Sequence, residues 1–297
     1  MSETGKVYQV QYPATVSGKV YNVRDVSGDS SVSGKVYQVA NISGGGGGEP
    51  ATKYGATVDT WIGDVDENGM LTSSTWTGAL NFVGVKEIGY EGLLGAFYRC
   101  GGITSVDFSS LQSVDSFGLQ YAFYQCDSIT SADFSSLVSI GIRGFSYAFY
   151  NSLRIVNLDF SSLQSVADYG LEYAFNSAGL TTSLDLSSLQ SAEDYSFQYA
   201  FRHTLMTSAD FSSLQSAGAS CFSSAFYDCT RLSSISFPSL TDVQTSSFGS
   251  SATGRAFRNC TALTEIHFRA DMQATIEAMS QYDNKWGATN ATIYFDL

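Results

Sequence analysis

Apolar and polar side chains alternate in short runs through most of this chain, and the runs recur at a regular interval. Ile103, Val106 and Phe108 alternate with polar neighbours, which predicts a short strand with its apolar side turned inward. A Ser-Ser-Leu bend follows, and the group from Leu119 to Phe123 predicts a single helical turn on the opposite side. Each unit is therefore expected to contain a strand, a bend and a short helix.

Two markers give the length of the unit. An Ala-Phe pair has its Phe at positions 97, 123, 149, 175, 201, 226 and 257, so that most intervals are 26 residues. The aromatic residue or Leu of a D-F-S-S-L segment follows the same interval at Phe108, Phe134, Phe160, Leu186, Phe211, Phe237 and Phe268. A unit of this length cannot bury its own apolar face, whereas stacked units can. The sequence therefore predicts an α/β repeat solenoid of about seven turns.

The order of residues within one unit carries a family resemblance. Residues Ala122 to Leu137 read A-F-Y-x-C-x-x-I-T-S-x-D-F-S-S-L, which resembles the BspA-like leucine-rich repeat. The resemblance covers roughly residues 90 to 270 and implies a curved, right-handed solenoid with a parallel sheet. Three middle units replace the Cys by Ser152, Ala178 and Thr204, so we expect this position to require a small side chain rather than sulfur.

Composition changes along the chain and divides it into five predicted segments. Residues 1–53 contain no Phe, Trp or Cys, carry five basic and four acidic residues, and include five consecutive glycines from Gly44 to Gly48. Such glycine runs disfavour helices and strands and act as flexible linkers. The prediction is an extended N-terminal attachment tail over 1–43, a linker over 44–53, an N-terminal cap over 54–92, the solenoid over 93–268 and a C-terminal cap over 269–297.

The two caps are expected to cover the solenoid ends, where apolar surface and unpaired strand edges would otherwise be exposed. In the C-terminal cap, Asp271 is a candidate helix cap, and three apolar residues at helical spacing follow it: Met272, Ile276 and Met279. Residues 291–295 predict a terminal strand. In the N-terminal cap, residues 58–76 predict a hairpin with its turn at Asn68 and Gly69.

The tail has a repeat of its own, G-K-V-Y-x-V, at residues 5–10, 18–23 and 34–39. Each copy has the alternation of a short strand, but such strands are too short to fold alone. We expect an attachment segment that orders on a partner or on sister copies; the alternative is an unstructured arm. The candidate attachment residues are Val7, Tyr8, Val20, Tyr21, Val36 and Tyr37.

Overall composition excludes several classes of protein. Of the 297 residues, 43% are hydrophobic and 14% are charged, which is typical of a folded core and not of a disordered chain. The net charge of −13 opposes binding to phosphate backbones, so no nucleic-acid partner is expected. No run of 18 apolar residues occurs, and residues 1–20 lack the basic start and apolar middle of a secretory signal. We therefore expect neither membrane insertion nor export by the usual route.

The cysteines are expected to be buried, reduced and structural. The total of five is odd, no C-x-x-C pair occurs, and four of them share one position in different units: Cys100, Cys126, Cys229 and Cys260. An odd count in a chain of this length is unlike a secreted disulfide framework, and zinc requires four converging ligands. Neither a disulfide scaffold nor a zinc site is predicted.

One acidic segment matches the opening of a calcium-binding loop. Asp64, Asp66, Asn68 and Gly69 fit D-x-D-x-N-G, in which alternate oxygens surround the cation. The twelfth position, which should hold a bidentate acid, is Thr75. An acidic turn is therefore favoured over a metal site, and no cofactor is predicted.

Five aspartates share one strand position in successive units: Asp107, Asp133, Asp159, Asp185 and Asp210. If the strands stack in register, their carboxylates form a column with a step of about 5 Å. One interpretation is that flanking serines and backbone amides solvate this column. The alternatives are that the column binds amines, cations or sugar hydroxyls, or that two of its acids hydrolyse glycosides. Equivalent acids on a regular sheet lack the asymmetry that hydrolysis requires, so no catalytic residue is predicted.

Tyrosines form a second column. Tyr98, Tyr124, Tyr150 and Tyr227 directly follow the Ala-Phe pair, and four others directly precede it. Because Ala and Phe should face the core, we expect the tyrosine rings to be partly exposed, and Tyr is enriched at interfaces. The alternative is that the rings only cover the stacked units. The candidate binding residues are those that precede the pair: Tyr121, Tyr147, Tyr173 and Tyr199.

The combination of tail, flexible joint and capped solenoid resembles repeat proteins carried by bacteriophages of gut bacteria. Residues 55–69 and 285–297 look like the caps of such proteins. The resemblance implies a non-enzymatic virion protein of the tail or particle surface, made in the host cytoplasm. It would bind other virion proteins through its tail and a host glycan or protein through its solenoid, as a homo-oligomer. The alternatives are a cell-surface adhesin of the same family and, third, a carbohydrate-active enzyme.

Overall fold

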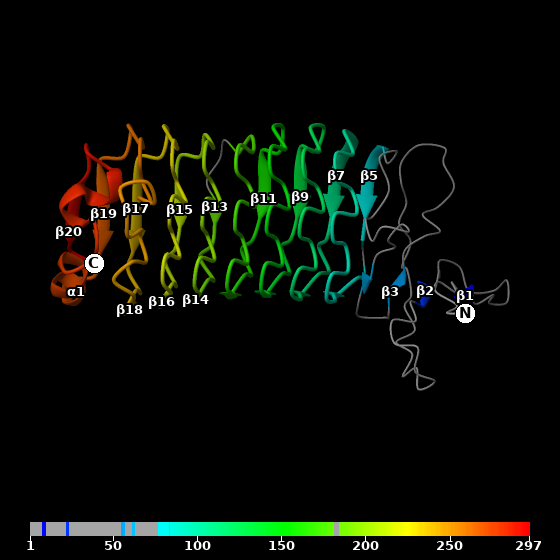
Figure 1. Cartoon of the computed structure of the whole chain (residues 1–297), viewed down its shortest axis with the longest axis horizontal. Coiled ribbons are helices and arrows are strands. Elements are labelled where there is room, and N and C mark those ends of the chain that lie inside the picture. Colours follow the sequence, from blue (N-terminus) through cyan, green and yellow to red (C-terminus); the bar gives the residue numbers. More distant parts are fainter. Residues whose placement is uncertain are drawn as a thin grey trace, which may run out of the picture.

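The structure is a computed structural model in which the chain folds as a solenoid. It describes residues 77–82, 84–180 and 184–297, together with the backbone of four two-residue strands at 8–9, 22–23, 55–56 and 61–62. From residue 77 to the C-terminus, coils of chain lie side by side along the long axis of the molecule (Figure 1). The predicted repeat solenoid with parallel sheets is confirmed.

One side of every coil is a strand that pairs in parallel with the strands of its neighbours. The first sheet on this side consists of β5 (Thr77–Asn81), β7 (Gly102–Asp107), β9 (Ser131–Asp133) and β11 (Asn157–Asp159). The second consists of β13 (Leu184–Asp185), β15 (Ala209–Asp210), β17 (Ser234–Phe237), β19 (Glu265–Phe268) and β20 (Thr292–Phe295). Equivalent residues of successive units are paired, so a residue of one coil lies beside its counterpart in the next.

After the Ser-Ser-Leu bend, each coil adds a shorter strand to a nine-stranded sheet. Its strands are β3 (Gly55–Ala56), β4 (Trp61–Ile62), β6 (Glu87–Ile88), β8 (Ser113–Val114), β10 (Ser139–Ile140), β12 (Ser165–Val166), β14 (Ser191–Ala192), β16 (Ser216–Ala217) and β18 (Asp242–Val243). All pairs are parallel except β3 and β4, which form a hairpin. The two strand series enclose the core from different sides.

The third side of each coil is a run of β-turns, where the sequence predicted a helical turn. Gly118, Gln120 and Ala122 donate their N–H groups to the carbonyl three residues earlier, at 3.0 to 3.2 Å. The intervening N–H groups donate to the next coil, from Leu119 to Gly144, from Tyr121 to Ser146 and from Phe123 to Ala148. A helix would use every N–H internally and leave no bond between coils, whereas this alternation satisfies both requirements.

The core is a set of stacked aromatic columns. Eight fully buried positions follow one another in successive coils: Phe82, Phe108, Phe134, Phe160, Leu186, Phe211, Phe237 and Phe268. Phe108 and Phe134 stack with ring centroids 5.2 Å apart, and Phe123 meets Phe108 edge-on at 6.3 Å. Offset-stacked and edge-on rings are the favoured aromatic arrangements. One continuous core thus runs along the axis.

The solenoid begins earlier than the predicted boundary at residue 93. β5 pairs in parallel with β7, and Phe82 stacks on Phe108 at 4.2 Å. Residues 77–82 and 84–92, which the sequence assigned to the N-terminal cap, therefore continue the repeat. The predicted hairpin turn at Asn68 and Gly69 lies outside the described residues.

The C-terminal cap covers the last coil as expected. It contains η1 (Ala270–Met272), α1 (Gln273–Glu277) and η2 (Tyr282–Gly287), and β20 pairs with β19. The predicted apolar residues Met272, Ile276 and Met279 are buried. Asp271, however, is not a helix cap, because no side chain caps η1 or α1. Its carboxylate instead accepts two hydrogen bonds from the Arg269 guanidinium, at 2.9 and 2.6 Å.

In the tail, two copies of G-K-V-Y-x-V pair with each other. β1 (Tyr8–Gln9) and β2 (Asn22–Val23) are antiparallel, with Tyr8 opposite Val23. The other attachment candidates lie outside the described residues: Val7, Val20, Tyr21, Val36 and Tyr37. The calcium-loop candidates Asp64, Asp66 and Asn68 also lie outside them.

Candidate functional site

The aspartate column is present and has a local structural role. Asp107 lies opposite Asp133, Asp133 opposite Asp159, and Asp185 opposite Asp210. In all five coils, the Oδ1 atom accepts the backbone N–H of the serine two residues later, at 2.8 to 2.9 Å. A short acid that accepts this bond closes a tight turn. Each aspartate therefore fixes the bend that follows its strand.

We expect Asp133→Ala to destabilise the solenoid by about 1 kcal/mol, because the Ser135 N–H loses its acceptor. Asp133→Asn keeps an acceptor oxygen at the same place and is the matched control, with a smaller loss. Urea unfolding followed by circular dichroism measures both. Equal losses in the two variants would show that the negative charge, rather than the turn, is what stabilises this position.

The repeat position held by cysteine also supplies a hydrogen-bond donor. From the sequence we expected only that it requires a small side chain. The Sγ atom of Cys126 donates to the carbonyl of Phe97 in the preceding coil at 3.0 Å. Cys229 and Cys260 make the equivalent bonds at 3.0 and 2.9 Å, and the Ser152 hydroxyl makes it at 2.9 Å. Ser replaces Cys here because both are small and both donate. Ala178 satisfies size only, and the Thr204 hydroxyl donates instead to the Phe201 carbonyl of its own coil at 2.8 Å.

All five thiols should resist alkylation by iodoacetamide at pH 8 in the folded protein, and all five should react in guanidinium chloride. Each thiol is buried and forms no disulfide, and burial raises the pKa of Cys221 and Cys229 to about 12 and that of Cys126 and Cys260 as well. Mass spectrometry counts the labelled sites. Rapid modification of any thiol under native conditions would contradict this packing.

The tyrosine column is also present, on the β-turn side. Tyr121 and Tyr147 stack at 5.0 Å, Tyr147 and Tyr173 at 4.6 Å, and Tyr173 and Tyr199 at 4.5 Å. All four rings are half-buried. Burial raises the pKa of Tyr173 to about 12, with the neighbouring Tyr199 as the next cause, so its hydroxyl stays protonated at neutral pH. The column presents a row of hydroxyl-bearing ring edges to solvent.

Further stacked rings extend this column into a surface, which we call the tyrosine face. Tyr98, Tyr124 and Tyr150 stack at 4.8 and 5.0 Å, and Tyr169 and Tyr195 at 4.8 Å. Its members are Tyr98, Tyr121, Tyr124, Tyr147, Tyr150, Tyr169, Tyr173, Tyr195, Tyr199 and Tyr227. The face spans the β-turn side of six coils.

Arginines complete the tyrosine face. The Arg143 guanidinium lies 4.2 Å from the Tyr169 ring centroid, and Arg202 lies 4.6 Å from that of Tyr227. Arg143 also forms an ion pair of 2.5 Å with Glu172, which is largely buried. Cations over aromatic faces are attracted by the ring quadrupole. Tyr and Arg together are the residue types most enriched in the energetic centres of protein interfaces.

The backbone under the tyrosine column is left-handed at each tyrosine position. Tyr121, Tyr147, Tyr173 and Tyr199 have φ between 53° and 56°, in the left-handed region. This conformation costs a bulky residue about 1 kcal/mol or more relative to Gly. The first coil has Gly95 at the same position, with φ of 60°. The turn therefore does not require tyrosine, and Ser224 occupies the same position in a later coil with φ of 52°.

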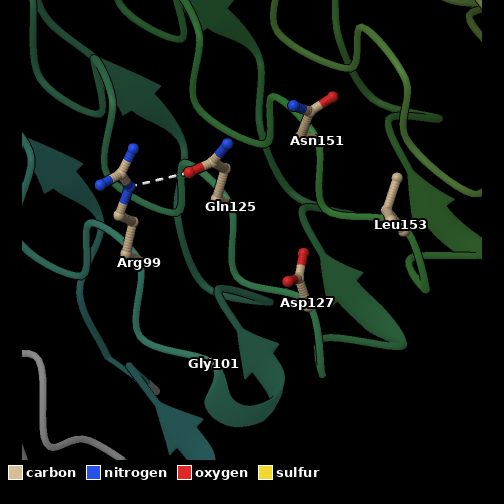
Figure 2. A pocket seen from close by; sticks show the side chains of 6 residues that line it. All are labelled: Arg99, Gly101, Gln125, Asp127, Asn151 and Leu153. Atoms are coloured by element: carbon tan, nitrogen blue, oxygen red, sulfur yellow. Dashed lines mark hydrogen bonds between the residues drawn. The ribbon is translucent and has the colours of Figure 1, made fainter.

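A shallow groove lies beside the Tyr98, Tyr124 and Tyr150 rings. Figure 2 shows Arg99, Gln125 and Asn151 in a row on successive coils, with the Arg99 Nε donating to the Gln125 Oε1 at 2.8 Å. The other lining residues are Gly101, Asp127 and Leu153, and the groove encloses about 480 Å³. This groove was not among the sites predicted from the sequence. The signal was available, because these residues occupy two repeat positions whose identity changes from coil to coil.

The part of the chain that the structure describes contains no group of three His, Cys, Asp or Glu side chains suited to a metal ion. It also contains no helix long and apolar enough to cross a bilayer.

Comparisons with known proteins identify the repeats. A family model for the BspA type leucine rich repeat region matches residues 93–225 and 223–280, with six copies. No curated protein matches the chain. A solved leucine-rich repeat protein of T. pallidum is 17% identical, covers 70% of this chain and 68% of its own, and has a TM-score of 0.29. A leucine-rich cell-surface protein of Faecalibacterium prausnitzii is 14% identical, covers 73% and 72%, and has a TM-score of 0.30.

Proposed function

The chain belongs to the BspA-type leucine-rich repeat family, and on that basis we propose that it is a non-enzymatic recognition scaffold that presents its tyrosine face to a partner. Solenoid repeats offer extended, regular surfaces, and their rigidity keeps the entropy cost of binding low. The observation that carries the proposal is the stacking of half-exposed tyrosines, at 4.5 to 5.0 Å, on a backbone that does not require them.

For the setting, we propose the surface or tail of a bacteriophage particle, with the N-terminal tail as the anchor. Three features support this proposal: the threefold G-K-V-Y-x-V repeat, the glycine run at 44–48, and the pairing of the first two copies through β1 and β2. Short strands that pair through their backbones are a common means of docking one protein on another. A bacterial cell-surface adhesin of the same family is the alternative, and there the tail would dock on a cell-envelope component.

Deleting residues 1–48 tests the anchor. In particles released from cells that carry the gene, the full chain should be detected by mass spectrometry of the purified fraction, and the deleted chain should be absent from it. Deleting only residues 44–48 is the control and should leave incorporation unchanged. Detection of the full chain on the cell surface and never in particles would favour the adhesin. Normal incorporation of the chain that lacks residues 1–48 would contradict the anchor in both settings.

Substituting the centre of the tyrosine face tests the recognition role. We expect the double change Tyr147→Ser and Tyr173→Ser to reduce binding of the fluorescent full chain to host cells by about tenfold or more. Gln164→Ser with Gln190→Ser, at exposed positions beside the nine-stranded sheet, is the matched control. Circular dichroism confirms that both variants fold. Equal cell binding by the two variants would assign recognition to another face.

A further inference from the structure

The tyrosine column has an open end. Within the column each ring covers the faces of its neighbours, so the outer surface consists of ring edges. In the coil that precedes Tyr121, the equivalent position is Gly95, and a Cβ placed there would meet no atom of the described residues within 4 Å. Among the described residues, the Tyr121 ring contacts Tyr147 in the following coil and Tyr124 in the adjacent column. A flat ring is therefore missing from the column at Gly95.

Groups that bind sugars well lie on the same coil as Gly95. The Tyr98 ring belongs to the next column, and the Arg99 guanidinium lies 5.2 Å from its centroid. The groove of Arg99, Gln125, Asp127 and Asn151 spans this coil and the next two (Figure 2). Guanidinium, amide and carboxylate groups offer donors and acceptors in fixed planes, which match the hydroxyls around a sugar ring.

The chemistry of the groove favours a sugar over an aromatic side chain of a peptide. An aromatic anchor binds tightly where a pocket desolvates it completely. Here Arg99, Gly101 and Asp127 are exposed, and Leu153 keeps 60% of its surface in contact with solvent. A pyranose needs only one apolar face covered and keeps its hydroxyls bonded to side chains or water. The net charge of −13 also disfavours an anionic ligand.

We propose that the Gly95 opening and the adjoining groove form a binding site for a neutral oligosaccharide. One pyranose ring occupies the missing step of the column and stacks on Tyr121. The following sugar units run along the axis over Arg99, Gln125 and Asn151. This site rests on the proposed recognition function and specifies a ligand class for one end of the tyrosine face.

The test begins with a glycan array of neutral bacterial and plant oligosaccharides, probed with the fluorescent full chain. The oligosaccharide that binds most strongly is then titrated by calorimetry. We expect Tyr121→Leu to weaken its binding by about tenfold. Gly95→Tyr should abolish binding, because the new ring fills the opening. This substitution suits the backbone, since Tyr residues of the same column already adopt φ of 53° to 56°.

Gln164→Leu, at an exposed position beside the nine-stranded sheet and outside the tyrosine face, is the control and should bind the oligosaccharide as well as the unaltered chain does. Binding to no oligosaccharide on the array, or binding that neither Tyr121→Leu nor Gly95→Tyr weakens, would overturn the site. Such a result leaves the recognition role intact if host-cell binding still depends on Tyr147 and Tyr173. Loss of that dependence, with oligosaccharide binding preserved, would instead overturn the proposed role of the wider face.

Discussion

Replacing Phe134 by Ala is expected to lower the free energy of unfolding by about 4 kcal/mol. The ring is fully buried and stacks on Phe108 at 5.2 Å and on Phe160 at 5.4 Å. It also meets Phe145 edge-on at 5.0 Å. Its removal leaves a cavity that regular, hydrogen-bonded coils on both sides cannot close. Because each coil contacts only its neighbours, the loss weakens the coupling between the two halves of the solenoid.

Phe134→Leu is the matched control, and we expect it to cost about 1 kcal/mol. The chain itself has Leu186 at the equivalent position, where it is fully buried. Urea unfolding followed by far-UV circular dichroism measures both variants, and a broadened or two-step transition for the Ala variant would reflect the weakened coupling. If the Ala variant lost no more stability than the Leu variant, Phe134 would not lie in a packed column.

The second large effect is expected from Gly179→Ala, at about 3 kcal/mol of lost stability. A Cβ on Gly179 would lie 2.1 Å from the carbonyl oxygen of Leu153 in the preceding coil. The obstacle is backbone, so no side-chain rotation relieves it, and the coils must separate. The backbone conformation is not the cause, because φ of Gly179 is not in the left-handed region.

Gly101→Ala provides the control for Gly179→Ala because both glycines occupy the same repeat position, three units apart. A Cβ on Gly101 would meet no atom of the described residues within 4 Å, so we expect the stability of Gly101→Ala to change by less than about 0.5 kcal/mol. Thermal unfolding of the two variants measures the difference. Similar stabilities for both would contradict the close approach of the coils at Leu153 and Gly179.

The solenoid itself was predictable because its evidence is long-range and redundant. Two markers with the same interval, at the Ala-Phe pair and at the D-F-S-S-L segment, fix both the repeat and the inward-facing residues. The β-turn side was not predictable. The pattern around Leu119 and Phe123 fits a helical turn as well as consecutive β-turns, and the choice depends on bonds to the next coil that a single unit does not contain.

The start of the solenoid was placed too late for a related reason. Phe82 follows the interval of the core column, but the coil that contains it has Gly95 in place of the tyrosine that later coils carry. A unit that departs from the consensus at one position is read as a cap. The structure shows instead that β5 pairs with β7 and that Phe82 stacks on Phe108, as in the later coils. The departure from the repeat lies at the surface position of Gly95.

For the candidate site, the sequence identified which residues form columns, and the structure showed their contacts and backbone conformation. The aspartates were found by position, but their bond to the N–H two residues later depends on the bend. The tyrosines were found as partly exposed rings, but their left-handed backbone could not be predicted, because propensity assigns that conformation to Gly and Asn. The opening at Gly95 could be recognised only from two structural facts together: the tyrosine rings stack from coil to coil, and Gly95 occupies the same left-handed position without a ring.

The stacked rings, the aspartate column and the opening at Gly95 all require neighbouring coils to lie in register, one repeat apart. Disulfide formation between engineered cysteines tests this most directly. The Gln190 N–H donates to the Gln164 carbonyl at 2.8 Å, and Gln215 bonds to Gln190 in the same way, so the three exposed side chains lie on successive coils. Neighbouring coils are about 5 Å apart, within reach of a disulfide, and alternate coils are about 10 Å apart, beyond it.

On mild oxidation, Gln164→Cys with Gln190→Cys is therefore expected to form an intramolecular disulfide in nearly every molecule. Gln164→Cys with Gln215→Cys is expected to form none, and the buried native thiols should not interfere. Mass spectrometry of the digested protein counts both products. Efficient cross-linking of 164 to 215, or none between 164 and 190, would contradict the register on which the recognition surface depends.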